Sequence, residues 1–329
     1  MAVTRWGILG CGRIAHKFAQ DLQTIPDARL HAVASTDLNR AVTFAADYGA
    51  PNAYGRYEDL LSCPDLDVVY IATTHNFHYE NTLMCLNGGL PVLCEKPFAM
   101  NSRQVRTMVE TAREKGVFLM EALWSRFMPC IVKAKELADS GAIGTVTGLR
   151  ADFGFRAPFD PEKRLFNKAL GGGSLLDIGI YPLFLSYLLL GKPTTVKAAA
   201  VFGQTGIDEQ CGMVLTYDNG AMANLFSTLT AKTDTDACIY GSAGNLHIGG
   251  RFHEGQSVTI KPAEGDRQIY TYPRQTWGYN YEANHVMQCL REGKTESPLW
   301  SLDDSLNLMD LLDTLRQAAG IQYAEDQPL

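Results

Sequence analysis

The first third of the chain alternates short apolar runs with longer amphipathic segments, and this alternation constrains the fold more than any other feature. Strands are predicted at residues 5–9, 30–34, 68–72, 92–94 and 118–120, and helices at 13–23, 38–48, 77–86 and 102–115. Alternating strands and helices with short connections form a parallel sheet with helices on both faces. The run 68–72 is continuously apolar, as expected for a strand buried on both faces.

The pattern changes after residue 122, where strands follow one another at short spacing. Strands are predicted at 146–155, 195–202, 211–217, 221–228, 237–240 and 257–261, and helices at 130–140, 174–190, 281–291 and 302–318. Asp218-Asn219-Gly220 predicts a hairpin whose two turn positions both have positive φ. We therefore predict an α/β protein with two domains. Residues 1–122 form a Rossmann-type domain, and residues 123–329 form an α+β domain with a large, open, mostly antiparallel sheet.

Composition favours a globular protein and disfavours nucleic-acid binding and membrane association. A chain of 329 residues, 46% hydrophobic and 20% charged, is typical of a globular protein of about two domains. The net charge of −7 disfavours nucleic acid as a partner. The eight cysteines form no Cys-x-x-Cys pair, which favours reduced thiols in a cytoplasmic protein. The most apolar run, 181–190, is shorter than the ~20 residues of a membrane span, so we expect no membrane association.

A G-x-G-x-x-A motif lies between the first strand and the first helix. Gly10 allows the tight turn, Gly12 lets the backbone approach a pyrophosphate, and Ala15 lets the helix pack closely on the strand. The amides of Arg13 and Ile14 at the helix N-terminus attract an anion. A glycine-rich turn of an ordinary α/β domain is the alternative, but the position between a strand and a helix favours a dinucleotide site.

The end of the second strand bears on the choice of cofactor. NAD sites usually carry an acidic residue there for the ribose 2′-hydroxyl, and this chain has Ser35 followed by Thr36. Arg40 on the next helix could bind a 2′-phosphate. Asp37 would favour NAD if it turned inward, whereas as a helix N-cap it would not. We expect NADP, with NAD as the alternative.

Other candidate residues follow the third and fourth of the predicted strands. Lys96 stands at a strand end, where ligands of parallel sheets bind, and Pro97 disfavours helical geometry for it. The expected lining of the cofactor cleft comprises Thr73, Thr74, His75, His78, Glu95 and Lys96. His75 and His78 lack a third ligand, so no metal is predicted, and His78 is alternatively a packing or capping residue.

The glycine run 171–173 leads into a helix that carries Asp177 and Tyr181 four residues apart, on one face. They are either a proton-handling pair or a tyrosine hydroxyl satisfied in the core. Trp124 and Arg126 are candidates for contact with nicotinamide, and the substrate candidates are Lys96, Trp124, Phe155, Arg164, Phe166, Asp177 and Tyr181. For most of these, surface or core packing is the alternative.

Three of these motifs together resemble the glucose–fructose oxidoreductase/inositol dehydrogenase/MocA family. They are G-x-G-x-x-A, Glu95-Lys96-Pro97 and Asp177-x-Gly179-x-Tyr181, and segments 120–127, 281–283 and 296–298 extend the resemblance over essentially the whole chain. The resemblance implies a Rossmann domain followed by a domain whose open sheet packs on a second subunit.

The implied activity is NADP-dependent hydride transfer between the nicotinamide and a carbinol carbon of a sugar or trans-dihydrodiol. Lys96 matches the family's catalytic lysine, Tyr181 its proton-transferring residue, and Asp177 would orient Lys96 or a sugar hydroxyl. Thr36 stands where NADP-using relatives often carry arginine, which weakens the expected preference. The alternatives are an NAD-dependent glycosidase of the same fold and a non-enzymatic NADP-binding sensor.

Overall fold

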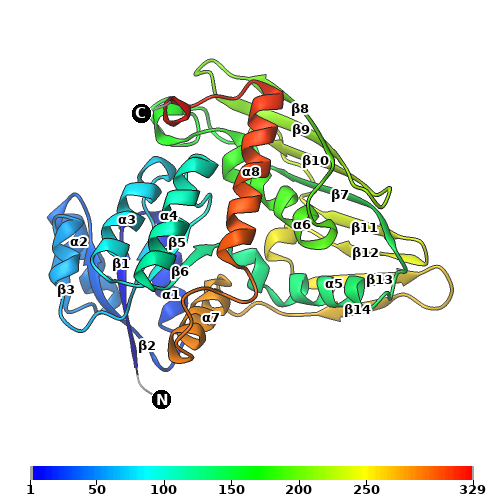
Figure 1. Ribbon diagram of the computed structural model, residues 1–329. Helices are drawn as coiled ribbons and strands as arrows, with labels where there is room; N and C mark the ends of the chain where they lie inside the picture. The colour runs from blue at the N-terminus through cyan, green and yellow to red at the C-terminus, as the bar shows by residue number, and fades with distance from the viewer. Residues whose placement is uncertain (1–2, 328–329) are drawn as a thin grey trace. The chain divides into compact units, whose positions relative to one another are not determined.

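A computed structural model describes residues 3–327 of the chain (Figure 1). The chain forms two compact units. The first runs to Trp124 and also takes in Gln275–Leu306, and the second comprises Ser125–Arg274 and the residues from Asn307 onward. The expected division near residue 122 differs from this one in the segment 275–306, which returns to the first unit.

The first unit is built on a six-stranded parallel sheet in the order β3-β2-β1-β4-β5-β6. The strands are β1 (Thr4–Leu9), β2 (Ala28–Ala34), β3 (Asn52–Tyr54), β4 (Val68–Ile71), β5 (Val92–Glu95) and β6 (Leu119–Ala122). The helices are α1 (Arg13–Leu22), α2 (Leu38–Tyr48), α3 (His78–Asn87), α4 (Ser102–Lys115) and α7 (Tyr279–Arg291). This strand order is that of a dinucleotide-binding Rossmann sheet, and the predicted α/β fold is confirmed.

The centre of this sheet is buried on both faces. Every residue of β4, β5 and β6 is buried. This accounts for the continuously apolar sequence of β4, whereas β5 and β6 each bury one carboxyl group, Glu95 and Glu121. α1 packs against α7, and α3 packs against α4. The short edge strand β3 was not predicted, because three half-buried residues carry no periodic signal.

The second unit holds an eight-stranded sheet in the order β14-β13-β12-β11-β7-β10-β9-β8. The strands are β7 (Val146–Gly154), β8 (Thr195–Phe202), β9 (Asp208–Thr216), β10 (Met222–Thr228), β11 (Ala237–Gly241), β12 (Gly244–Ile248), β13 (Ser257–Pro262) and β14 (Gln268–Thr271). Only the β7–β10 pair is parallel, so the prediction of a mostly antiparallel sheet is confirmed. The remaining helices are α5 (Pro129–Asp139), α6 (Ile180–Leu190) and α8 (Leu302–Ala319).

One face of this sheet is covered by helices. α5 packs on β12 and β13 and α6 on β7 and β10, so both lie on the same side of the sheet (Figure 1). The strands alternate accordingly: Leu149 and Ala151 are buried, whereas Arg150 between them is exposed. The exposed face carries a groove of about 570 Å³ whose lining includes Lys197, Val214 and Phe226.

The hairpin at Asp218-Asn219-Gly220 forms, but its turn differs from the predicted one. Only Gly220 has positive φ, at 82°. Tyr217 and Ala221 close a three-residue loop through Tyr217 N to Ala221 O at 3.1 Å. A three-residue loop needs the left-handed conformation only at its last position, so Gly220 adopts positive φ and Asn219 does not.

Within residues 3–327, one helical stretch, Lys168–Leu190, is long and apolar enough to span a membrane, but 78% of its most apolar part is buried inside the protein. A mostly buried apolar helix is typical of the core of a folded domain. All eight cysteines are free thiols, as predicted, and all but Cys238 are buried.

Candidate functional site

The glycine motif forms an open anion cradle at the end of β1. Gly10 has φ of 96°, and a Cβ there would stand 2.9 Å from the carbonyl oxygen of Ala72. A Cβ at Gly12 would meet no atom within 4 Å. No side chain caps α1, so the amides of Arg13 and Ile14 remain available to an anion. The residues present therefore fit a dinucleotide pyrophosphate.

The segment after β2 resolves the role of Asp37. Its carboxylate caps α2, accepting from Asn39 N at 2.9 Å and Arg40 N at 3.3 Å. Asp37 is therefore the N-cap, and Ser35, which is buried, directly follows the last residue of β2. The Arg40 guanidinium lies 3.9 Å from Asp37, and both side chains are about half exposed.

Tyr57 is a neighbour that sequence reasoning missed. It lies near Thr36, Arg40 and Cys11, and burial raises the pKa of its hydroxyl. No motif marks it, because it lies about 20 residues further along the chain and only folding brings it beside the end of β2.

His78 is a structural clamp in the first unit. It is fully buried, with Nδ1 2.8 Å from the Pro97 carbonyl and Nε2 3.2 Å from the Thr73 carbonyl. It thus ties the loop after β4 to the loop after β5, and the packing alternative for His78 is the one that the geometry supports. Thr74 donates to Asn76 Oδ1 at 2.8 Å, and His75 is buried beside His78 with its ring 5.8 Å away.

Lys96 follows β5 directly and is half-buried, and its amide donates to Glu95 Oε2 at 3.1 Å. The other oxygen of Glu95 accepts from the hydroxyl of buried Tyr70. Burial, with the charge of Glu95, raises the pKa of Tyr70 well above its usual value, so Tyr70 stays protonated as the donor. Glu95, itself held by Tyr70, therefore fixes the backbone of Lys96 through a hydrogen bond to its amide.

In the second unit, Asp177 and Tyr181 lie on a helix that begins irregularly. Leu175–Gly179 forms one π-helical segment that continues into α6. Arg164 Nη1 lies 3.0 Å from Asp177 Oδ1, so the structure joins two of the predicted substrate residues in an ion pair. The Asp177 side chain is 10% exposed, and a partly buried pair of this kind is held more firmly than a surface pair.

Tyr181 sits in an aromatic cluster and is 5% exposed. Its ring lies 5.6 Å from Phe153 and 5.0 Å from His253, and His253 stacks on Phe153 at 4.2 Å. His253 was missed by sequence reasoning, because it lies in an unpatterned segment between β12 and β13. Phe155 is half-buried, with its ring 6.3 Å from Phe153.

The remaining candidates are largely packed. Trp124 stacks on Tyr279 at 4.7 Å and is buried, and Phe166 is buried with Phe159 edge-on at 5.0 Å. Arg126 is buried in the short helical turn Trp124–Phe127.

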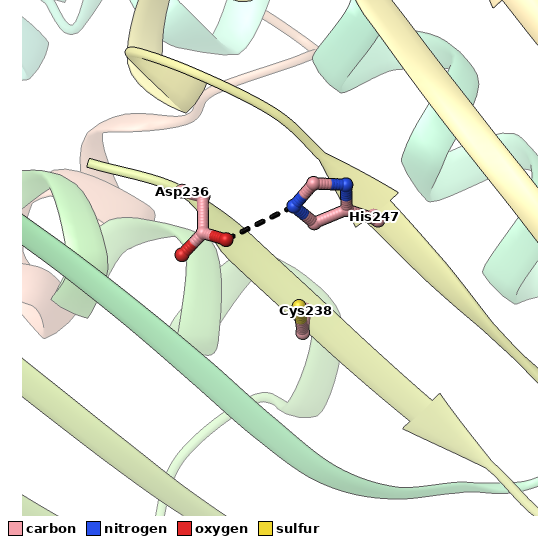
Figure 2. Close-up of side chains that lie close together, drawn as sticks. All are labelled: Asp236, Cys238 and His247. Carbon is pink, nitrogen blue, oxygen red and sulfur yellow. Dashed lines mark hydrogen bonds and ion pairs between the residues drawn. The ribbon is translucent and has the colours of Figure 1, made fainter. Parts of the chain in front are cut away.

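One group in the described residues of the second unit has metal-ligand chemistry. Asp236, Cys238 and His247 come from the segment before β11, from β11 and from β12 (Figure 2). His247 Nε2 lies 3.0 Å from Asp236 Oδ2. Arg150 Nη2 donates to Asp236 at 3.2 Å and approaches the Cys238 sulfur at 3.7 Å. A guanidinium therefore already balances the carboxylate of this group.

The comparisons with known proteins extend over the whole chain. Residues 4–123 match the model of an oxidoreductase family with an NAD-binding Rossmann fold, and residues 131–247 match a GFO/IDH/MocA C-terminal domain. Two relatives are named trans-1,2-dihydrobenzene-1,2-diol dehydrogenase. The Xenopus laevis protein is 40% identical, with 97% of this chain and 99% of that protein covered, and the human one is 34% identical, with 98% and 99% covered.

Solved structures show the same fold. An aldose-aldose oxidoreductase from Caulobacter crescentus, complexed with glycerol, is similar with a TM-score of 0.88 at 26% identity, covering 97% of this chain and 98% of that one. A 3-ketoreductase from Actinomadura kijaniata, complexed with NADP and TDP-benzene, gives 0.86 at 27% identity, covering 96% and 98%. The chain is therefore an NAD(P)-binding oxidoreductase of the GFO/IDH/MocA family.

Proposed function

We propose that this protein is an NADP-dependent dehydrogenase that oxidises a carbinol carbon of a trans-dihydrodiol or an aldose, or reduces the corresponding carbonyl. The observation that carries the proposal is buried Tyr181, one turn after the Asp177–Arg164 ion pair. This helix therefore carries a phenol and a carboxylate close together, and a phenol can take a proton from a substrate hydroxyl or return one to it. The names of the relatives support the substrate class.

The preference for NADP rests on the end of β2. The Asp37 carboxylate caps α2, so it does not take the role of the acidic residue that binds the ribose 2′-hydroxyl in NAD sites. Arg40, with Thr36 and Tyr57 beside it, supplies the positive charge for a 2′-phosphate. The pyrophosphate would bind at Gly10, Gly12 and the amides of α1, and Thr73, Thr74 and His75 would contact the cofactor beyond it.

The cofactor, when bound, exchanges hydride with the carbinol carbon. The side chains of the chain manage the proton and the charge. Tyr181 takes the proton of the substrate hydroxyl during oxidation and returns it during reduction. Lys96 donates a hydrogen bond to the same oxygen and stabilises the negative charge that develops there. Asp177, held by Arg164, orients the substrate through a neighbouring hydroxyl, and Phe155 would contact the substrate.

We also propose that the partner of the uncovered sheet face is a second copy of this chain. The face exposes Val214, Met222 and Tyr240, and the groove in it is lined by Ala199 and Phe226 among others. Several large apolar side chains exposed on one face of a sheet are typical of an interaction site. The free thiols fit a reducing compartment, the cytoplasm.

The first test is turnover by the purified protein, followed by the absorbance of the reduced nicotinamide. NADP and NAD are each offered with a trans-dihydrodiol, D-xylose and D-glucose. Turnover with NADP above NAD supports the proposal. A tightly bound NAD that is not consumed during hydrolysis of a glycoside would overturn it, as would cofactor binding without turnover of any sugar or diol.

Replacing Tyr181 by phenylalanine tests the proposed proton transfer. We expect kcat of Tyr181→Phe to fall by about 10²-fold or more, which is the usual contribution of a general base. The Kd of NADP should stay unchanged, because the cofactor binds in the first unit. Steady-state kinetics with equilibrium binding of NADP measure both, and an unchanged kcat would remove Tyr181 from the mechanism.

A further inference from the structure

A buried hydrogen-bond network holds the start of the helix that carries Asp177 and Tyr181. Asp208 of β9 accepts through Oδ2 from Leu175 N at 2.7 Å and from Ser174 Oγ at 2.9 Å. The hydroxyl of Tyr323 donates to the carbonyl of Gly172 at 2.7 Å. Asp208 and Ser174 are fully buried and Tyr323 is 4% exposed, so water does not compete for these bonds.

The glycine run leaves no space between these groups. A Cβ at Gly173, which has φ of 131°, would stand 2.2 Å from Asp208 Oδ1 and 2.8 Å from the Tyr323 hydroxyl. A Cβ at Gly172 would stand 2.4 Å from the carbonyl oxygen of Arg164. The network, the glycine run and the backbone of Arg164 are therefore in direct contact, and a displacement of one moves the others.

Tyr323 is itself fixed from the end of the chain. Its amide donates to Asp326 Oδ2 at 2.8 Å, and the same carboxylate accepts from Arg316 Nη1 at 2.9 Å. The Arg316 guanidinium is buried and lies 5.4 Å from the centre of the Tyr323 ring. The segment that follows α8 is thus anchored at two points and presents its tyrosine hydroxyl to the glycine run.

We infer that Asp208 and Tyr323 are positioning residues for the oxidoreductase reaction, an inference that rests on the proposed function. Two groups position the Asp177 carboxylate, the backbone of its helix and the side chain of Arg164, and the network contacts both segments. Its own backbone follows Leu175 by two residues, and its ion-pair partner Arg164 packs against Gly172 through its carbonyl. Tyr181 follows on the same helix, so the network sets where the phenol and the carboxylate stand.

The test replaces Tyr323 by phenylalanine, which keeps the ring and removes the bond to Gly172. The matched control is Tyr217→Phe. The Tyr217 hydroxyl is also buried and hydrogen-bonds at 2.5 Å to Ser186 on the same helix, beyond Tyr181. We expect kcat of Tyr323→Phe to fall about tenfold, equivalent to about 1.4 kcal/mol of transition-state stabilisation. The Kd of NADP should be unchanged in both variants, and kcat should be unchanged in the control.

A second measurement does not depend on turnover. We expect the amides of residues 171–181 to exchange hydrogen faster in Tyr323→Phe than in the parent protein, and to keep their protection in Tyr217→Phe. Asp326→Ala, which releases the Tyr323 amide, should act in the same direction. Equal exchange in all variants, or equal losses of kcat in Tyr323→Phe and Tyr217→Phe, would overturn the inference. A parent protein without turnover on sugars or diols would instead refute the proposed function, and the exchange data would still decide whether the network anchors the helix.

Discussion

At the scale of single residues, the first unit contains carboxyl groups that burial has changed chemically. Burial raises the pKa of Glu121 to about 7, although the Trp300 indole donates to it at 3.2 Å. Glu282 is fully buried and, among the described residues, neither of its oxygens has a hydrogen-bond partner. Burial, with the charges of Glu95 and Asp21, raises the pKa of Glu282 well above its usual value. Glu282 therefore stays protonated at neutral pH and Glu121 is protonated below about pH 7, so each makes stability depend on pH.

Glu121 allows the sign of that dependence to be tested. Between its ordinary pKa of 4.5 and about 7, the folded chain holds a proton on Glu121 that the unfolded chain has lost. Stability from this group is therefore present at low pH and is lost as the pH rises toward 7. We expect Glu121→Gln, which keeps an acceptor for Trp300, to flatten the fall in Tm over this range. Thermal unfolding across a pH series measures the slope, and an unchanged slope would contradict the assignment.

At the scale of elements, local patterns locate the helices well, and long-range contacts decide where some of them dock. The segment 279–291 reads as an ordinary amphipathic helix, and nothing in it states that it belongs to the first unit. Asp21 at the end of α1 makes that connection. Its carboxylate accepts from the amides of Gly278 at 2.7 Å, Tyr279 at 2.8 Å and Trp277 at 2.9 Å.

Removing this charge should cost stability. Asp21 is buried, and hydrogen bonds to a charged group contribute about 1.5–3 kcal/mol, so we expect Asp21→Asn to lower the free energy of unfolding by about that amount. Asp37→Asn is the control, because Asn caps an exposed helix as well as Asp does. Urea unfolding of both variants measures the difference. Equal stabilities would show that Asp21 does not hold α7.

At the scale of the whole molecule, the proposed homodimer depends on the uncovered face of the eight-stranded sheet. On this face Met222 is exposed beside polar Arg150 and Asn224, and Val214, which lines the groove, is 38% exposed. A charge at the centre of a close apolar contact lacks a partner and must be desolvated.

Val214→Asp is therefore expected to dissociate the proposed homodimer. The variant should sediment as a monomer at concentrations where the parent is a dimer, since an unpaired buried charge costs several kcal/mol. Val42→Asp, at an exposed position of α2 in the first unit, is the control and should leave the mass unchanged. A parent protein that is monomeric, or a variant that stays dimeric, would refute this interface.

The sequence by itself determined the class of fold and the principal elements, because burial imposes periodicity on every long strand and helix. α2, α4 and β8 have the predicted bounds, and the glycine motif and Lys96 lie at strand ends as expected. Three short strands, β3, β12 and β14, were missed. β3 and β14 bury none of their residues, and β12 alternates over only Leu246–Ile248, which is too short a run to be recognised.

Only the tertiary structure decided the partners of individual side chains. It made Asp37 a cap and His78 a clamp, and it returned α7 to the first unit through Asp21. It also brought His253 to Tyr181 and Tyr323 to the glycine run, across about 70 and 150 positions of the chain. Hydrogen bonds and ring contacts depend on distances of a few ångströms in space, whatever the separation of the residues in the sequence. A local sequence pattern therefore cannot predict them.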